Sequence, residues 1–256
     1  MSLAQKLLDC IKSNSSYECI KDMDSSGQLE ILMPIIKDMK SVGECKYHVV
    51  NCFEHSLLAL KTFEEILNTN NFFESHLSNE IHKNLNEQVD DGLTKKDILK
   101  LGILLHDIGK PEAKTIDNTG RVRFRRHDTI GADKIFSIGK LLNLNDSNVL
   151  ILYKYVKYHM SLLQMYKTGD MSIDNLFNVF DKLCNETIDV FILGYVDIVS
   201  TRKLLNPDED MKIIETYMNY ALTNYLYNYK NIIRYCINII DVSDPFQLIC
   251  LTVNQS

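Results

Sequence analysis

The spacing of apolar residues along the chain restricts its fold more than any other feature. Apolar side chains recur at intervals of three and four across most of the 256 residues, and only 10 Gly and 4 Pro interrupt them. Such spacing places apolar side chains on one face of a helix, so it predicts an all-α bundle. The turn sequence at 117–120, followed by alternating residues, predicts at most one small β-hairpin near 115–125.

Length and composition predict one compact helical domain over residues 1–256. With 45% hydrophobic residues, the chain can bury a sizeable core. The polar stretch 68–91 is interpreted as a long excursion between core helices, with a domain boundary there as the alternative. The seven cysteines include no C-x-x-C pair and are interpreted as reduced core thiols.

Net charge and hydropathy exclude some classes of partner. The 28 Lys and Arg against 34 Asp and Glu give a net charge of −6, so a nucleotide would need a local basic pocket. Apolar runs such as 191–196 fall far short of the roughly 20 residues that cross a bilayer. We therefore expect a cytoplasmic protein with no membrane contact and no obligate protein partner.

Several charged residues are predicted to lie on apolar helices. A helix expected over 50–68 carries His55 beside core residues, and a second helix, capped by Thr94, carries His106 and Asp107 in its last turn. An unpaired charge there costs several kcal/mol unless a hydrogen bond or a metal compensates it. The same argument applies to Asp197, which interrupts the apolar run 191–199.

Two further histidines are predicted near helix ends. His159 closes a helix that begins near Asp146, and His127 precedes a helix that Asp128 is expected to cap. Each histidine alone is more often a hydrogen-bonded core residue than a ligand, and one His-Asp pair arises readily by chance. Imidazoles and carboxylates from separate buried helices are, however, the ligand set of divalent metals such as Fe, Mn, Co, Ni and Zn.

These residues resemble a known family. His55, His106-Asp107 and Asp197 resemble the H…HD…D signature of the HD-superfamily phosphohydrolases. The HD domain of bacterial CCA-adding tRNA nucleotidyltransferases is similar over about 47–202, with helical extensions on both sides. The matching residues are Tyr47-His48, Glu54-His55-Ser56-Leu57, Leu104-Leu105-His106-Asp107-Ile108-Gly109-Lys110-Pro111, Gly120, Phe124, His127, Gly131-Ala132 and His159-Met160. The nucleotidyltransferase part of those enzymes needs a Gly-Ser turn followed by a D-x-D motif on a strand, and this chain has neither. The resemblance therefore does not imply that this chain adds nucleotides to tRNA.

The resemblance implies a metal-dependent hydrolase with one or two divalent ions (Fe, Mn, Ni, Co, Mg or Zn). One ion would be held by His55, His106, Asp107 and Asp197. His127 and His159 would hold a second ion, with Asp107 as the bridge and a catalytic residue. Two such ions can activate water and neutralise charge at phosphorus.

Basic residues near these ligands are the candidates for substrate binding. The resemblance implies that Lys110 contacts phosphate and takes part in catalysis, and Arg123, Arg125 and Arg126 precede His127 directly. Alternatively, the arginines lie on a solvated edge of the hairpin and do not bind phosphate. His48 is interpreted either as a residue that contacts the substrate or as a buried hydrogen-bond donor.

The expected substrate is a phosphorylated small molecule, a nucleotide or an RNA end. Hydrolysis of nucleotide phosphomonoesters or phosphodiesters, including 2′,3′-cyclic phosphates, is the leading prediction. The same ligands would serve a nucleoside-triphosphate or guanosine-polyphosphate hydrolase. A non-catalytic metal-bound sensor or interaction module is the third alternative.

Overall fold

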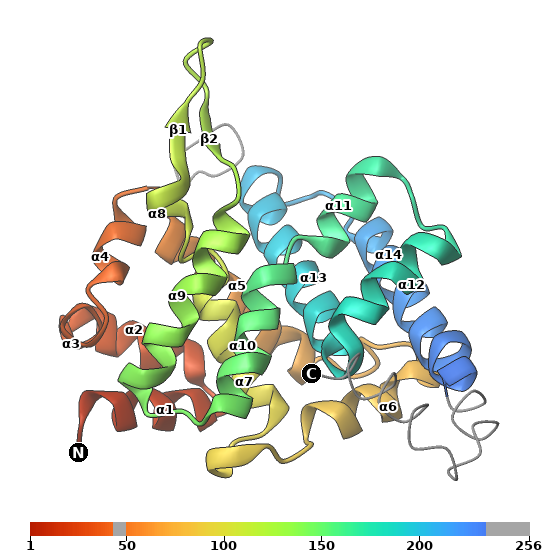
Figure 1. Cartoon of the computed structure of the whole chain (residues 1–256), viewed down its shortest axis with the longest axis horizontal. Coiled ribbons are helices and arrows are strands. Elements are labelled where there is room, and N and C mark those ends of the chain that lie inside the picture. The colour runs from red at the N-terminus through yellow and green to blue at the C-terminus, as the bar shows by residue number, and fades with distance from the viewer. Residues whose placement is uncertain (43–49, 234–256) are drawn as a thin grey trace, which may run out of the picture.

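The computed structural model describes residues 1–42 and 50–233. Helices make up most of this part, and one two-stranded hairpin projects from it (Figure 1), so the predicted all-α fold is confirmed. The amino-terminal layer comprises α1 (Leu3–Lys12), α2 (Ser16–Ser25), α3 (Gln28–Leu32) and α4 (Ile35–Lys40). The central helices are α5 (Cys52–Asn68), α7 (Lys95–Leu105), α8 (Lys110–Ala113), α9 (His127–Leu142), α10 (Asp146–Tyr158) and α13 (Thr187–Leu205). The remaining helices are α6 (Ser75–Leu85), α11 (Ser161–Thr168), α12 (Ile173–Leu183), α14 (Lys212–Thr223), the π-helical turn Asn224–Tyr229 and the 3₁₀ turns Asp90–Gly92 and Cys184–Glu186.

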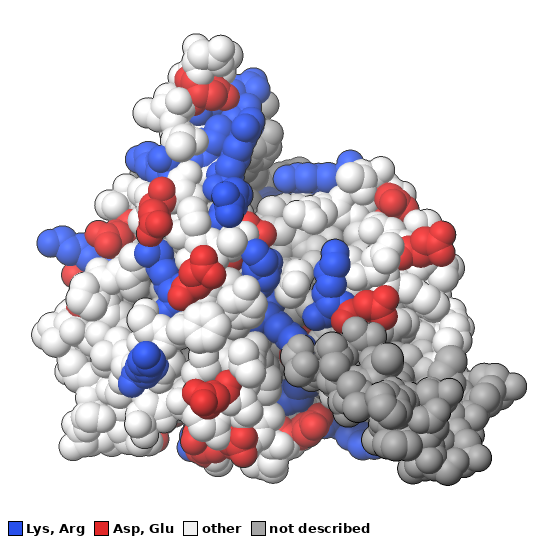
Figure 2. Space-filling model, in the orientation of Figure 1, with Lys and Arg blue, Asp and Glu red and all other residues white. Residues whose placement is uncertain are grey.

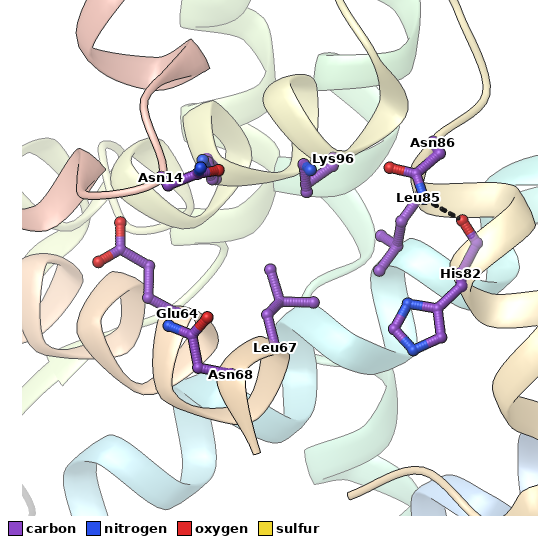
Figure 3. A pocket seen from close by; sticks show the side chains of 9 residues that line it. Asn14, Glu64, Leu67, Asn68, His82, Leu85, Asn86 and Lys96 are labelled. Carbon is purple, nitrogen blue, oxygen red and sulfur yellow. Dashed lines mark hydrogen bonds between the residues drawn. The ribbon is translucent and has the colours of Figure 1, made fainter. Parts of the chain in front are cut away.

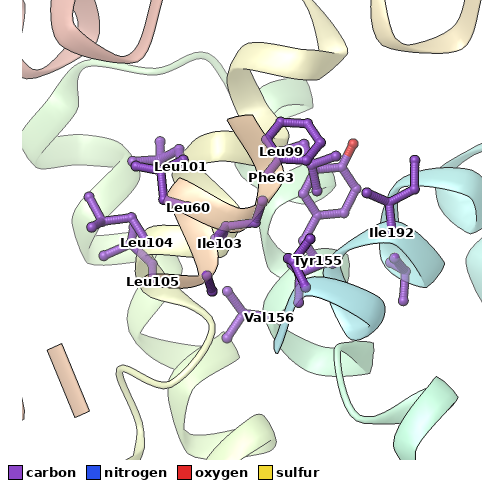
Figure 4. Close-up of a cluster of buried hydrophobic side chains, with 14 of the residues drawn as sticks. Leu60, Phe63, Leu99, Leu101, Ile103, Leu104, Leu105, Tyr155, Val156 and Ile192 are labelled. Atoms are coloured by element: carbon purple, nitrogen blue, oxygen red, sulfur yellow. The ribbon is translucent and has the colours of Figure 1, made fainter. Parts of the chain in front are cut away.

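Helix α13 lies in the middle of the core and packs against α5, α7, α10, α11 and α14. Every residue from Thr187 to Ser200 is buried, which explains why this helix is apolar on all sides rather than on one face. Figure 4 shows Tyr155 of α10 and Ile192 of α13 beside Phe63 of α5 and the leucines of α7. The central helices therefore share one continuous core.

Capping residues set the helix boundaries, and most of the predicted boundaries hold. Thr94 caps α7 in a capping box with Asp97, as expected. Asn51 caps α5, which begins at Cys52 rather than at 50. The cap predicted at Asp128 is wrong, because α9 begins at His127 with Arg126 at the cap position in the left-handed conformation (φ 63°).

The stretch 68–91 is more ordered than its polarity indicates. It contains α6, whose apolar residues Leu77, Ile81 and Leu85 are buried against α13 and α14. The hairpin, in contrast, follows the prediction: β1 (Lys114–Ile116) pairs antiparallel with β2 (Val122–Phe124). Gly120 takes a left-handed φ of 79° in its turn, a conformation that glycine adopts without strain.

The cysteines are not all reduced, which corrects the prediction. Cys10 and Cys19 form a disulfide between α1 and α2, because the short turn between these helices brings their Cα atoms to 5.4 Å. Cys52 is a buried thiol, as expected. Cys45, Cys236 and Cys250 lie outside the described residues. None of the described helices has the length and apolarity needed to span a bilayer.

Gly109 allows α8 and α9 to approach closely. A Cβ at this position would overlap the carbonyl oxygen of His127 and would lie 2.5 Å from the backbone nitrogen of Gly131. Both contacts are with backbone atoms, which cannot rotate away as a side chain can. Gly109 therefore fixes the distance between the segment that carries Asp107 and the start of α9.

We predict that Gly109→Ala lowers the free energy of unfolding by at least about 2 kcal/mol, because the added methyl must push two backbone segments apart. Urea unfolding followed by circular dichroism measures the change. Lys140→Ala, at an exposed position of α9, is the control and should stay within about 0.5 kcal/mol of the unsubstituted protein. Equal stability of Gly109→Ala and this control would contradict the close-packing argument.

Candidate metal centre

Six predicted side chains converge in the core in two groups that share Asp107. One group consists of His55 from α5, His106 and Asp107 from the turn after α7, and Asp197 from α13, with one nitrogen or oxygen of each within 4.8 Å of the others. The second group consists of Asp107, His127 and His159 within the same limit. His106 and Asp107 follow the end of α7 at Leu105 rather than forming its last turn. His48 lies outside the described residues.

The two oxygens of Asp107 face different histidines. Oδ2 lies 3.1 Å from Nε2 of His106 and 3.8 Å from Nε2 of His55. Oδ1 lies 3.3 Å from Nε2 of His127 and 3.8 Å from Nε2 of His159. Asp197 Oδ1 joins the first group only, at 2.8 Å from Nε2 of His55 and 3.5 Å from Nε2 of His106. One carboxylate thus stands between the two groups.

Three of the histidines are oriented by the same hydrogen bond. In each, Nδ1 donates to the backbone carbonyl three residues earlier, which can only accept, so Nδ1 carries the hydrogen and Nε2 turns into the centre. The bonds are His106 to Ile103 at 2.8 Å, His127 to Phe124 at 2.8 Å and His159 to Val156 at 2.7 Å. His106 and His159 occupy the C-cap positions of α7 and α10, where such carbonyls are close.

His55 is oriented by a residue that the sequence analysis missed. Its Nδ1 lies 3.3 Å from Oγ1 of Thr201, and the Thr201 hydroxyl also lies 3.2 Å from the backbone oxygen of Asp197. Thr201 is 146 positions from His55 and is not a metal-ligating residue type, so no motif or spacing indicated its role.

Positive charge on His106 and Lys110 neutralises the two buried carboxylates of the centre. Burial would raise the pKa of Asp107, but the charges of His106 and Lys110 outweigh it and hold that pKa well below its usual value. For Asp197, hydrogen bonds from His106 and His55 outweigh burial in the same direction. Burial would lower the pKa of His106, yet Asp107 and Asp197 raise it to about 10. When no cation is bound, the proton on His106 therefore neutralises part of the negative charge of Asp107 and Asp197.

His159 differs from His106 in its protonation. Burial, followed by the nearby His127 and His106, lowers the pKa of His159 to about 3. The imidazole of His159 is thus neutral at pH 7, which is the form that coordinates metals.

The residues present fit a divalent cation. Nε2 of His106 and Oδ2 of Asp107 are fully buried and form no hydrogen bond of good geometry within the described chain, so only ion pairs, such as those of Asp107 with His106 and with Lys110, partner them. Buried polar atoms almost always have a hydrogen-bonding partner, so a pair of such atoms facing each other indicates a site for an ion. Imidazole nitrogen with carboxylate oxygen suits Mn, Fe, Co, Ni or Zn.

The predicted substrate-binding residues differ in their burial and in the partners that they contact. Lys110 is 6% exposed, and its Nζ lies 2.5 Å from Asp107 Oδ2 and over the ring of Phe124. Arg123 pairs with Asp117 within the hairpin at 3.0 Å, whereas Arg125 and Arg126 are exposed. Figure 2 shows basic side chains along the hairpin. Their contact with substrate stays a prediction.

Two comparisons place the chain among known proteins. The sequence model of the family described as HD domain matches residues 52–186, more than half of the chain. Among curated relatives, an A-adding tRNA nucleotidyltransferase from Deinococcus radiodurans is 26% identical over 151 residues. This match covers 59% of the chain but 29% of that protein, so the chain spans less than a third of its relative. The family match contains His55, His106, Asp107, His127 and His159, and Asp197 lies beyond it.

We predict that Asp107→Ala removes all bound metal, because this carboxylate faces both groups, while His159→Ala keeps part of the metal. Elemental analysis of protein purified without chelator measures the stoichiometry, and circular dichroism confirms that each variant folds. Full metal content in Asp107→Ala would contradict the shared role of this carboxylate. Loss of all metal in His159→Ala would show that the two groups cannot be filled separately.

We also predict that the affinity for Mn²⁺ rises with pH between 7 and 8.5. Because the pKa of His106 is raised to about 10 in the ion-free protein, His106 is protonated throughout this range and an incoming cation must displace its proton. The association constant should then rise about tenfold for each pH unit. Calorimetric titration at several pH values measures this slope, which His106→Gln should reduce. A pH-independent affinity would contradict the assignment.

Proposed function

This chain belongs to the HD-domain family, which places it in a superfamily of metal-dependent phosphohydrolases, and we propose that it hydrolyses nucleotide phosphate esters. The observation that carries the proposal is the position of Asp107, whose two oxygens face two separate groups of histidines. A purely structural metal site is usually closed by four ligands around one ion. A carboxylate between two groups is suited instead to a centre with two ions.

In this proposal His55, His106, Asp107 and Asp197 hold one ion, and Asp107, His127 and His159 hold another. When bound, such ions lower the pKa of water and neutralise negative charge on the phosphate, which permits attack at phosphorus at neutral pH. The backbone carbonyls of Ile103, Phe124 and Val156 keep three imidazoles in one tautomer and one orientation. The Thr201 hydroxyl contacts Nδ1 of His55 and helps to orient that ring.

Lys110 supplies a fixed positive charge beside the reacting phosphate. Burial would lower its pKa, but the Asp107 charge outweighs burial and raises the pKa, so the ammonium stays protonated. The ammonium can therefore donate hydrogen bonds to a phosphate oxygen while it shields Asp107. We expect Arg125 and Arg126, which are exposed just before His127, to bind a second phosphate oxygen or a neighbouring phosphate.

A nucleotide or an RNA end is the proposed substrate. The relative that matches this chain is named for its action on tRNA, and the basic residues beside the centre are few, which suits one or two phosphates rather than a long polyanion. We place the protein in the cytoplasm, where these substrates occur. The Cys10–Cys19 disulfide would be unusual in that compartment.

We predict that the protein hydrolyses at least one of the following substrates with Mn, Ni, Co or Mg: 2′,3′-cyclic nucleotides, nucleoside monophosphates and bis-p-nitrophenyl phosphate. Lys110→Ala and Arg126→Ala should lower kcat/KM by about tenfold or more, since each removes a charged hydrogen bond to phosphate. Lys140→Ala, far along α9 and exposed, should leave the rate unchanged.

Three outcomes distinguish the alternatives. Unchanged kcat/KM in the Lys110, Arg125 and Arg126 variants would show that these basic residues do not bind substrate and that the arginines form only a solvated edge of the hairpin. Turnover of nucleoside triphosphates or guanosine polyphosphates alone would redirect the proposal to that class of hydrolase. Stoichiometric metal without turnover of any phosphate ester would favour a metal-bound sensor.

A further inference from the structure

A polar cavity lies near the start of α7, and none of its lining residues belongs to the metal centre. It has a volume of about 200 Å³. Figure 3 shows Asn14 and Lys96 on one wall, Glu64 and Asn68 of α5 on the opposite wall, and His82 of α6 at the side. The neighbouring turn between α1 and α2 is closed by the Cys10–Cys19 disulfide, so Asn14 sits on a constrained segment.

Lys100 brings a buried positive charge to this cavity. The residue is 2% exposed, and its Nζ donates to the backbone oxygens of Ile11 at 3.0 Å and Ser13 at 2.6 Å. An ammonium has three hydrogens, so two carbonyls leave one without an acceptor. Over residues 1–42 and 50–233, no carboxylate lies within ion-pairing distance of Lys100. Burial lowers the pKa of Lys100, and the more distant charges of Asp97 and Glu64 offset this only in part.

Lys96 adds a second positive charge one turn earlier on α7. Within the described chain, Lys96 forms neither a hydrogen bond nor an ion pair, and like charges four positions apart on a helix repel each other. Glu64 is the acidic residue in the lining, and its Oε1 already accepts from the backbone nitrogen of Tyr17 at 3.0 Å. Two ammonium groups and one carboxylate leave the cavity with a net positive charge.

We propose that this cavity binds a small anion, the phosphate or carboxylate group of a metabolite, between Lys96 and Lys100. The anion supplies a counter-charge within ion-pairing distance, which both lysines lack among the described residues, and it relieves their mutual repulsion. The amides of Asn14 and Asn68 are placed in the lining to hydrogen-bond the polar remainder of the ligand. A volume of about 200 Å³ suits a compact metabolite rather than a polymer.

Lysine acylation of the full-length protein, followed by mass spectrometry, measures anion binding in this cavity independently of the metal centre. Inorganic phosphate and malonate are the two probes, each added at constant ionic strength. A bound anion should slow acylation of Lys96, whereas Lys83, an exposed lysine of α6 outside the cavity, should react at its original rate. Protection by phosphate identifies a phosphate group, and protection by malonate identifies a carboxylate.

Calorimetry of the Lys96→Gln variant provides the second measurement. Loss of one charged hydrogen bond should weaken binding of the protecting probe by about tenfold, while Lys83→Gln should leave it unchanged. The Lys96 substitution lies at a partly exposed position, so the test does not depend on whether a Lys100 variant folds. Equal acylation of Lys96 with and without both probes would overturn the proposal, as would equal affinity in Lys96→Gln and the unsubstituted protein.

Discussion

The structure depends on how two buried carboxylates, Asp107 and Asp197, are neutralised. Transferring one carboxylate from water into a protein core costs several kcal/mol even after the surroundings relax, and here two lie in the same core. The charges and hydrogen bonds of His106, His55 and Lys110 hold both pKa values low, and His106 retains a proton to do so. A divalent cation at the same place supplies this charge without that proton, which is why the centre is suited to metal.

Helix ends bring these groups together without breaking the core. A histidine at the end of α7 or α10 can turn its Nδ1 back to a carbonyl that the helix leaves without an intrahelical partner, so one hydrogen bond satisfies the backbone and orients the ring. Asp197 comes instead from the middle of α13, where the residues directly before it and Ile198 and Val199 after it form a buried apolar run. Gly109 then lets the segment after Asp107 reach α9. The rings of His106, His127 and His159 are thus oriented by backbone atoms, which substitution of neighbouring side chains would leave in place, whereas His55 depends on the Thr201 side chain.

The sequence predicted the parts of this protein that depend on local patterns. Periodicity predicted the helices, Thr94 predicted the start of α7, and buried charges in apolar surroundings predicted His106, Asp107 and Asp197 before any contact was known. What it could not predict depends on contacts between distant segments. Thr201 meets His55 only because α5 packs against α13, and Cys10 meets Cys19 only because of the path of one turn. The cap at Asp128 failed because Arg126 adopts a left-handed conformation that sequence preference does not favour.

Helix α7 connects the candidate metal centre at its carboxyl end with the proposed anion cavity at its amino end. The dipole of a helix is positive at its amino end and negative at its carboxyl end, and it favours anions at the first and cations at the second by about 0.3–1 kcal/mol. In α7 the charges stand the other way round: Lys96 lies in the first turn, and Asp107 follows the last. Asp97 in the same turn offsets the Lys96 charge at the amino end, and protonated His106 and Lys110 offset the Asp107 charge at the carboxyl end. A cation beside Asp107 and an anion beside Lys96 would each add a charge of the sign that the dipole favours, so the same helix is suited to ligands of opposite charge at its two ends.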